Sequence, residues 1–291
     1  MADGPREITD IQLSGKIRPD NGELTLNRNT DQKFAVITGA SSGIGYELAK
    51  QFARNGFDLL VTAGSDDIER AALELQSNGI EVTPVQANLA EHEGTHALIA
   101  AIQSTGRPVD ALALNAGFGL TGAFVETDLA KEMDMIRVNV LSVVHVAKYV
   151  IKDMVARGAG RVLITSSIAG TMPTPYEAIY GATKAFDRSF AQSIREELKE
   201  TGVTVTTLMP GATETNFFHR AGADDTKLGT SEKDDPAEVA KEGFDALMAG
   251  KDHVVAGSMK NKLQAAAGYT LPDPLVAKAH ASMSKPGSAN K

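Results

Sequence analysis

Lys33-Phe-Ala-Val-Ile-Thr38 is followed directly by Gly39-Ala-Ser-Ser-Gly-Ile-Gly45. The first run is short, apolar and rich in residues that favour strands, and the apolar residues of 46–54 recur at helical spacing. The predicted order is therefore strand, tight glycine turn, helix. Glycines let the backbone approach a ligand closely, and a helix N-terminus offers free N–H groups to a pyrophosphate. The stretch therefore predicts a dinucleotide-binding site.

A second pattern, Tyr180-Gly-Ala-Thr-Lys184, places a phenol and an ammonium four residues apart. Residues at this spacing share one face of a helix. A cation beside a phenol favours the phenolate and brings the tyrosine pKa toward neutrality, where the group is a useful acid or base. By itself the pair is more often a solvated helix face, and it gains meaning from the glycine turn upstream.

Strand-like and helix-like segments alternate over residues 33–257. This predicts an α/β fold with one doubly wound parallel sheet of Rossmann type, a single domain of about seven strands with helices on both faces. The predicted strands are 34–38, 58–62, 81–86, 111–114, 161–166, 204–208 and 253–256. Long helices are predicted at about 128–157 and 177–200.

Further motifs occur in order along the chain: Asn115-Ala-Gly117, Asn139 in Arg-Val-Asn-Val, Ser167 thirteen residues before Tyr180 (180 − 167), and Pro210-Gly211 with Thr213 and Thr215 after it. Together with the glycine turn they resemble the short-chain dehydrogenase/reductase family, over about residues 33–257. The resemblance implies an NAD(P)-dependent oxidoreductase that moves a hydride between a nicotinamide cofactor and a carbonyl or secondary alcohol substrate.

The resemblance also implies roles for the catalytic residues. Tyr180 is the expected general acid and base, Ser167 holds the same substrate oxygen, and Lys184 lowers the tyrosine pKa and holds the nicotinamide ribose. Asn139 is expected to hold a water on a proton path toward Lys184. Ser166 is the alternative serine, but neighbours on a strand point to opposite faces, and the spacing favours Ser167.

The cofactor is expected to contact the glycine turn, the ends of the second, third and fourth strands, and the segment after the sixth. The candidate residues are Gly39, Ser41, Ser42, Gly43, Ile44, Gly45, Gly64, Ser65, Asn88, Leu89, Asn115, Ala116, Gly117, Tyr180, Lys184, Pro210, Gly211, Thr213 and Thr215. Asn88 stands where the family usually has an aspartate near adenine. The second strand lacks a terminal carboxylate, which favours NADP over NAD, although Asp66 and Asp67 follow closely.

The composition limits the remaining function classes. The 291 residues include no cysteine, which excludes disulfides and thiolate metal sites, and the net charge of −8 with no basic cluster argues against a nucleic-acid surface. No run of eighteen apolar residues occurs and residues 1–10 carry several charges, so a cytoplasmic protein without a membrane segment is expected. The family resemblance implies a homodimer or homotetramer through the two long helices.

The ends and one internal stretch depart from the alternating pattern. Residues 1–32 are polar and form either a small hairpin or a loose arm, and residues 258–291 are expected to be a C-terminal tail that covers the pocket or a neighbouring subunit. The stretch 211–235 is too long for a plain connector, and by resemblance it is a substrate lid. Phe118, Met172, Pro173, Phe217 and Phe218 predict a fairly apolar substrate pocket.

Two alternatives remain beside the oxidoreductase. His92-Glu-Gly-Thr-His96 matches the His-Glu-x-x-His pattern of zinc peptidases, but no third histidine follows at the required spacing, so a helix start without a metal is expected. His145 is interpreted as a packing or subunit-contact residue. The other alternative is a cofactor-binding regulatory protein with little or no turnover. A substitution among Asn139, Ser167, Tyr180 and Lys184 would favour it, and none is present.

Overall fold

The structure is a computed structural model that describes residues 32–76 and 79–290. The arm predicted over residues 1–32 therefore lies outside the described residues except for Gln32. The strands are β1 (Phe34–Thr38), β2 (Asp58–Ala63), β3 (Val82–Gln86), β4 (Ala111–Leu114), β5 (Gly160–Thr165), β6 (Val203–Pro210) and β7 (His253–Ala256). The main helices are α1 (Gly43–Arg54), α2 (Asp67–Gln76), α3 (His92–Ser104), α4 (Leu129–Ile136), α5 (Ser142–Arg157), α6 (Ala178–Glu197), α9 (Pro236–Met248), α10 (Met259–Thr270) and α11 (Asp273–Ser284).

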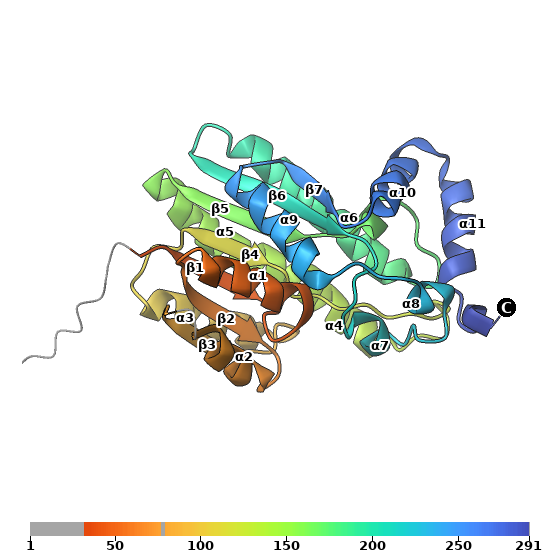
Figure 1. Cartoon of the computed structure of the whole chain (residues 1–291), viewed down its shortest axis with the longest axis horizontal. Coiled ribbons are helices and arrows are strands. Elements are labelled where there is room, and N and C mark those ends of the chain that lie inside the picture. The colour runs from red at the N-terminus through yellow and green to blue at the C-terminus, as the bar shows by residue number, and fades with distance from the viewer. Residues whose placement is uncertain (1–31, 77–78, 291) are drawn as a thin grey trace, which may run out of the picture. The chain divides into compact units, whose positions relative to one another are not determined.

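The seven strands form one parallel sheet in the order β3-β2-β1-β4-β5-β6-β7 (Figure 1). Val36 in the middle of β1 lies opposite Leu60 of β2 and Leu112 of β4. The chain runs outward from β1 to β3 and then crosses back to β4, so the strand order reverses between β1 and β4. Ligands bind at such a switch point, outside the carboxyl ends of the strands. The predicted fold class is confirmed.

Helices cover both faces of the sheet, which explains why β1 and β4 are buried along their whole length. Ile37 belongs to a core shared with α1, α2 and α9, whereas its neighbour Val36 belongs to a second core shared with α3, α5 and α6. The first core is anchored by Phe52 of α1, whose ring packs edge-on against Phe244 of α9 at 5.0 Å between centroids. This packing holds α1 rigidly behind the glycine turn.

Observed strand ends agree with the predicted ranges within two residues, and β1, β4 and β7 match at both ends. The helix predicted over 128–157 contains an irregularity that periodicity does not reveal. Between α4 and α5 the chain takes a π-helical turn, η1 (Arg137–Leu141), and Asn139 lies within it. Such single turns widen a helix locally and are frequent at functional sites.

The segments expected to be a lid and a tail are both structured. Residues 211–235 contain the short helices α7 (Phe217–Arg220) and α8 (Lys227–Thr230), and a bridge between Thr213 and Asp234 joins the two ends of this segment. Residues 258–290 form α10, α11 and a final 3-10 turn, η3 (Ser288–Asn290), instead of an extended tail. In Figure 1, α10 and α11 lie at the same end of the fold as α7 and α8.

Candidate active site

A cleft of about 970 Å³ opens at the carboxyl ends of the strands. Every residue that the sequence assigns to cofactor binding lines it, from Gly39 in the glycine turn to Thr215 in the lid. Ser167, Tyr180 and Lys184 line it as well, whereas Asn139 is fully buried behind it. The tertiary structure thus brings motifs that are scattered along the sequence into one site.

The glycine turn provides a close-fitting cradle at one end of this cleft. Gly39 has φ of 69°, in the left-handed region that favours glycine, and a Cβ on Gly45 would lie 2.1 Å from the Gly39 carbonyl oxygen. Ser42 is the N-cap of α1, yet its side chain makes no capping hydrogen bond. The N–H groups of the first turn of α1 are therefore not satisfied by that side chain, and they suit an anionic phosphate.

Two polar side chains organise the loops beside this turn. The Thr38 hydroxyl accepts hydrogen bonds from the backbone N–H groups of Asn115 and Ala116, both at 3.0 Å, which fixes the loop after β4 against β1. Asn88 uses its amide within its own loop. Its Oδ1 accepts from Ala90 N at 3.1 Å and its Nδ2 donates to Glu91 at 3.0 Å. The Asn88 side chain therefore shapes the loop that leads from β3 into α3.

Tyr180 and Ser167 meet in the cleft. Ser167 lies two residues after the end of β5 and is the N-cap of the 3-10 turn η2 (Ile168–Thr171). Its hydroxyl is hydrogen-bonded to the Tyr180 phenol. Ser166 points the other way, because its Oγ donates to the backbone oxygen of Lys184 at 2.6 Å. Strand alternation therefore places Ser167, and not Ser166, beside the phenol.

Lys184 is buried, and its ammonium is held at two points. Nζ donates to the Thr165 carbonyl at 2.8 Å and lies 3.0 Å from Oδ2 of Asp187, one helical turn further along α6. Asp187 is completely buried, and its other carboxylate oxygen has no hydrogen-bond partner among the described residues. The sequence interpretation missed Asp187, although the Lys-x-x-Asp spacing was visible, because spacing alone does not distinguish a buried pair from a surface pair.

Asn139 joins three parts of the site. Its Oδ1 accepts from Phe118 N at 3.1 Å, and its Nδ2 donates to Phe118 O at 3.0 Å and to the Thr183 hydroxyl at 3.0 Å. The π turn therefore carries an amide that fastens the loop after β4 to α6, next to Lys184. The role predicted for Asn139 in holding a water stays a prediction.

The sequence profile of the short chain dehydrogenase family matches residues 33–226. This chain belongs to the short-chain dehydrogenase/reductase family. It is 33% identical to oxidoreductase UcpA of Salmonella typhimurium over 216 residues, which cover 74% of this chain and 80% of the relative. The protein is accordingly an NAD(P)-dependent oxidoreductase of this family.

Two solved structures of the family share the fold. A short-chain dehydrogenase from Sphingobium yanoikuyae in complex with NADPH superposes with a TM-score of 0.72 at 30% identity, covering 77% of this chain and 87% of that one. The bulky-bulky ketone specific alcohol dehydrogenase from Comamonas testosteroni superposes with a TM-score of 0.69 at 26% identity, covering 80% of this chain and 91% of that one.

Within the described residues of this short-chain dehydrogenase, none of the helices has the length and apolar character needed to cross a membrane.

The electrostatics of Tyr180 in this short-chain dehydrogenase differ from the prediction. The sequence predicts that Lys184 lowers the tyrosine pKa. In the structure, burial raises the pKa of Tyr180 above its ordinary value, the hydrogen bond with Ser167 opposes that rise in part, and the charges of Glu177 and Asp187 add to it. The prediction fails here chiefly because the phenol is buried, and the nearby carboxylates of Glu177 and Asp187 act in the same direction. Tyr180 is therefore the neutral phenol at pH 7, the form that donates a proton.

The substrate end of the dehydrogenase cleft is mostly apolar. Phe118, Met172, Phe217 and Phe218 line it as predicted, and the Phe217 ring lies 5.3 Å from the Tyr180 ring between centroids. Pro173 was placed wrongly by the sequence interpretation, since it is exposed and not part of the lining. Phe217, in the lid segment after β6, therefore lies next to the Tyr180 phenol.

A buried polar cluster at this end was not foreseen. Glu177 lies just before α6, and its Oε2 is 3.4 Å from Nε2 of His280 and 3.3 Å from the Ser284 hydroxyl, both on α11. Burial raises the pKa of Glu177 to about 7 and lowers that of His280 to about 4. Both groups line or adjoin the cleft and both favour their neutral forms, so they offer hydrogen bonding without a fixed charge. No local pattern pairs residues 103 positions apart (280 − 177).

Proposed function

We propose that this protein is an NADP(H)-dependent oxidoreductase that interconverts a fairly apolar ketone and the corresponding secondary alcohol. One observation carries the proposal: Tyr180, hydrogen-bonded to Ser167, lies in the same cleft as the glycine turn at the N-terminus of α1. A site that holds a dinucleotide and a neutral phenol together suits carbonyl reduction.

The residues present fit a nicotinamide dinucleotide. The glycine turn and α1 would hold the pyrophosphate, residues 115–117 would lie near the adenosine ribose, and Pro210-Gly211 with Thr213 and Thr215 would cover the nicotinamide. Two of the three ammonium donors of Lys184 are used by Thr165 and Asp187, which leaves one for the nicotinamide ribose. When bound, the cofactor supplies or accepts the hydride.

The chain itself handles the proton and the developing charge. In reduction a hydride adds to the carbonyl carbon, and Tyr180 donates its proton to the carbonyl oxygen, which yields the alcohol. Ser167 hydrogen-bonds the same oxygen and stabilises the negative charge that builds on it. In oxidation Tyr180 takes the proton back from the alcohol. Asn139 fixes the loop at Phe118 to helix α6 through its three hydrogen bonds.

The preference for NADP rests on the end of β2. Ala63 ends the strand, so no carboxylate stands there to bind the ribose 2′-hydroxyl and repel a 2′-phosphate. Gly64 faces open space, and the Ser65 hydroxyl donates to Asp67, whose charge is also paired with Arg70. Ser42, Gly64 and Ser65 line the cleft and would receive the phosphate. The NADPH complex of the Sphingobium relative agrees with this choice.

The proposed substrate follows from the lining. Phe118, Met172 and Phe217 provide apolar lining, and α11 adds Val276 and Met283 to it. Bulky ketones are the substrates in the name of the Comamonas relative. A small, charged acid would find no fixed cation facing the phenol from α11, where His280 is neutral.

The exposed faces of the long helices support a homo-oligomer. Met133 of α4, Leu141 in the π turn and Phe186 of α6 are 41%, 58% and 39% exposed. Apolar side chains at this density on two neighbouring helices are typical of a subunit interface. We infer that the protein forms a homodimer or homotetramer through these helices.

The deciding experiment is a calorimetric titration with NADPH and NADH, followed by assay against a panel of bulky ketones. Tighter binding of NADPH, with NADPH oxidation on ketone addition, is the expected result. Binding without turnover on any ketone or alcohol would instead support a regulatory cofactor-binding protein. Failure to bind either nucleotide would overturn the proposal.

A further inference from the structure

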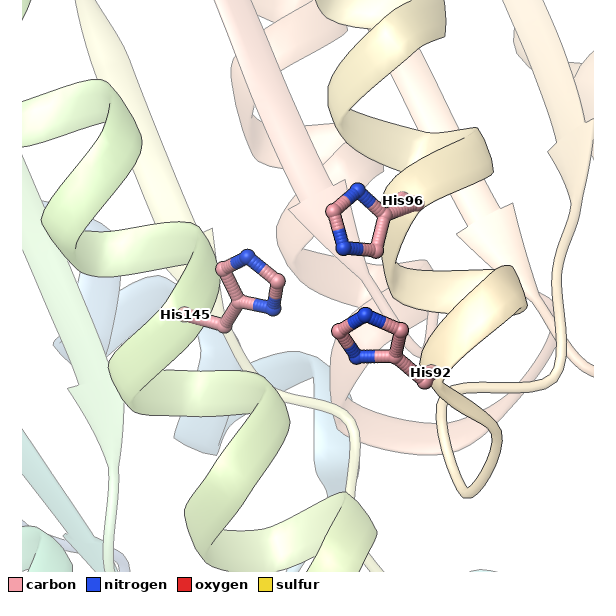
Figure 2. A group of neighbouring side chains, drawn as sticks. All are labelled: His92, His96 and His145. Atoms are coloured by element: carbon pink, nitrogen blue, oxygen red, sulfur yellow. The ribbon is translucent and has the colours of Figure 1, made fainter.

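Three histidines that the proposed oxidoreductase chemistry does not use lie together between two helices. His92 and His96 come from the first two turns of α3, and His145 comes from α5 (Figure 2). The ring centroids of His92 and His96 are 4.2 Å apart, and those of His96 and His145 are 4.9 Å apart. None of the three lines the cleft, so the group is a separate feature of the molecule.

The nitrogens of these rings converge as metal ligands do. One nitrogen from each ring lies within 4.8 Å of the other two. Tetrahedral Zn²⁺ with Zn–N bonds of about 2.0 Å needs nitrogens about 3.3 Å apart. Each ring must therefore move by only about an ångström, which small rotations of side chains deliver. His92 and His96 are exposed and free to make them.

The partners of the six histidines divide them into two classes. His219 pairs with Asp224 at 2.7 Å, His253 with Asp252 at 2.8 Å, and His280 with Glu177 at 3.4 Å. By contrast, the aromatic-ring contacts of the three clustered histidines within the described residues are with one another, and no carboxylate belongs to the group. No ion pair therefore competes with a metal for these three imidazoles within the described residues.

The two helices form a rigid frame for the three rings. Leu98 and Ile102 of α3 belong to the same buried core as Val146 and Val150 of α5. Gly94 lies between the two α3 histidines, and a Cβ there would lie 2.0 Å from the Asn88 carbonyl oxygen. The glycine therefore allows the first turn of α3 to pack tightly on the loop after β3.

We propose that His92, His96 and His145 bind one divalent first-row transition metal, of the zinc, nickel or copper class that imidazole prefers. Three protein ligands leave the remaining coordination position to water. The His-Glu-x-x-His pattern is thereby completed by a histidine from another helix, which a search along the sequence does not find. Glu93 does not belong to the cluster, so the site binds a metal and is not the catalytic arrangement of a zinc peptidase.

The metal would join α3 to α5 and so stabilise the fold. The helix α3 begins just after Asn88 and Leu89, which line the cleft, whereas α5 follows the π turn that carries Asn139. Binding to the folded protein alone raises its melting temperature by mass action. This readout is independent of the proposed oxidoreductase activity.

The test uses the full chain without a histidine tag, freed of metal by a chelator and titrated with Zn²⁺ in a calorimeter. We expect one Zn²⁺ per chain, and affinity lower by at least about tenfold in His145→Gln and in His96→Gln. His253→Gln is the matched control, because His253 is exposed and outside the cluster, and it should bind like the parent protein. Co²⁺ should give the visible absorption of a low-coordinate site in the parent and the control alone.

Melting curves complete the test and guard against variants that fail to fold. Zn²⁺ should raise the melting temperature of the parent and of His253→Gln, but not of His145→Gln, and Mg²⁺ should raise none of them. His145→Gln without metal must melt as a folded protein, and if it does not, His96→Gln on the exposed side takes its place. Equal Zn²⁺ affinity in parent and cluster variants, or no binding by the parent at micromolar Zn²⁺, would overturn the proposal.

Discussion

The ammonium of Lys184 lies 3.0 Å from the carboxylate of Asp187, and both groups are buried in α6 beneath the active-site cleft. Burial raises the pKa of Asp187, while Lys184 opposes that rise. Removing one partner of such a pair leaves a buried charge without compensation, which is far more costly than losing a surface pair. Asp187 is therefore a positioning residue for Lys184, and it also reduces the positive charge that reaches Tyr180.

Asp187→Asn should lower the free energy of unfolding by about 3 kcal/mol, measured by urea denaturation. It should also shift the rise of the oxidation rate with pH to lower pH, because Tyr180 must be deprotonated to act as the base and the Asp187 charge raises its pKa. Glu196→Gln is the matched control, because Glu196 near the end of α6 and Lys199 just beyond it form an exposed pair at the same spacing. Equal stability of the two variants would contradict a structural role for the buried pair.

Tyr180→Phe should reduce kcat by at least about a hundredfold while NADPH affinity stays nearly constant, because the ring is kept and only the proton donor is lost. Ser167→Ala should reduce kcat by a smaller factor, since one hydrogen bond to the substrate oxygen is removed. Steady-state kinetics and calorimetry on the same preparations measure both quantities. Activity retained in Tyr180→Phe would end the proposed mechanism.

The buried pair of Glu177 and His280 predicts opposing pH effects on stability. The pKa of Glu177 rises from 4.5 to about 7, so its stabilising contribution is complete below pH 4.5 and is lost as the pH rises to 7. The pKa of His280 falls from 6.5 to about 4, so its contribution is complete above pH 6.5 and is lost as the pH falls to 4. The two effects nearly cancel between pH 4.5 and 6.5.

Single substitutions should reveal how each of the two groups alone makes the free energy of unfolding depend on pH. Relative to the parent, Glu177→Gln should gain stability with rising pH between 4.5 and 7, whereas His280→Gln should lose stability with rising pH between 4 and 6.5. Each slope should approach about 1.4 kcal/mol per pH unit. Urea denaturation at several pH values measures them, and curves parallel to the parent in both variants would show that neither group is perturbed.

Gly64→Asp should reverse the cofactor preference. The site is open and has no positive φ, so an aspartate fits, and its carboxylate would bind a ribose 2′-hydroxyl and repel a 2′-phosphate. NADPH affinity should fall by at least about tenfold while NADH affinity holds or improves. Gly64→Asn has the same size without the charge and should change both affinities little. A preference for NADH in the parent protein would refute the assignment.

Light scattering tests the inferred oligomer. The parent protein should have the mass of a dimer or tetramer, and Leu141→Asp with Phe186→Asp should shift it toward the monomer, since charges would enter an apolar contact. Leu73→Asp is a suitable control, because Leu73 is 69% exposed on α2, away from the long helices. A parent protein that is monomeric at micromolar concentration would contradict the inferred homo-oligomer.

Much of this protein follows from local patterns in the sequence. The strand, glycine turn and helix at 33–54 are recognisable because each element has its own period and because glycine marks the close approach at Gly45. The i, i+4 spacing of Tyr180 and Lys184 and the offset of Ser167 are likewise local properties. Strand alternation even separates Ser167 from Ser166, as the hydrogen bond of Ser166 to Lys184 shows.

Other features depend on which residues the fold brings together and on what it buries. The pairing of Glu177 with His280 and the meeting of His145 with His92 and His96 join helices that are distant in sequence. Asp187 is near Lys184 in sequence, but its effect on the Tyr180 pKa arises because the fold removes both charges from water. Side-chain type and spacing are encoded locally, whereas burial and long-range contact, which set charge, pKa and ligand geometry, exist only once the helices have packed on the sheet.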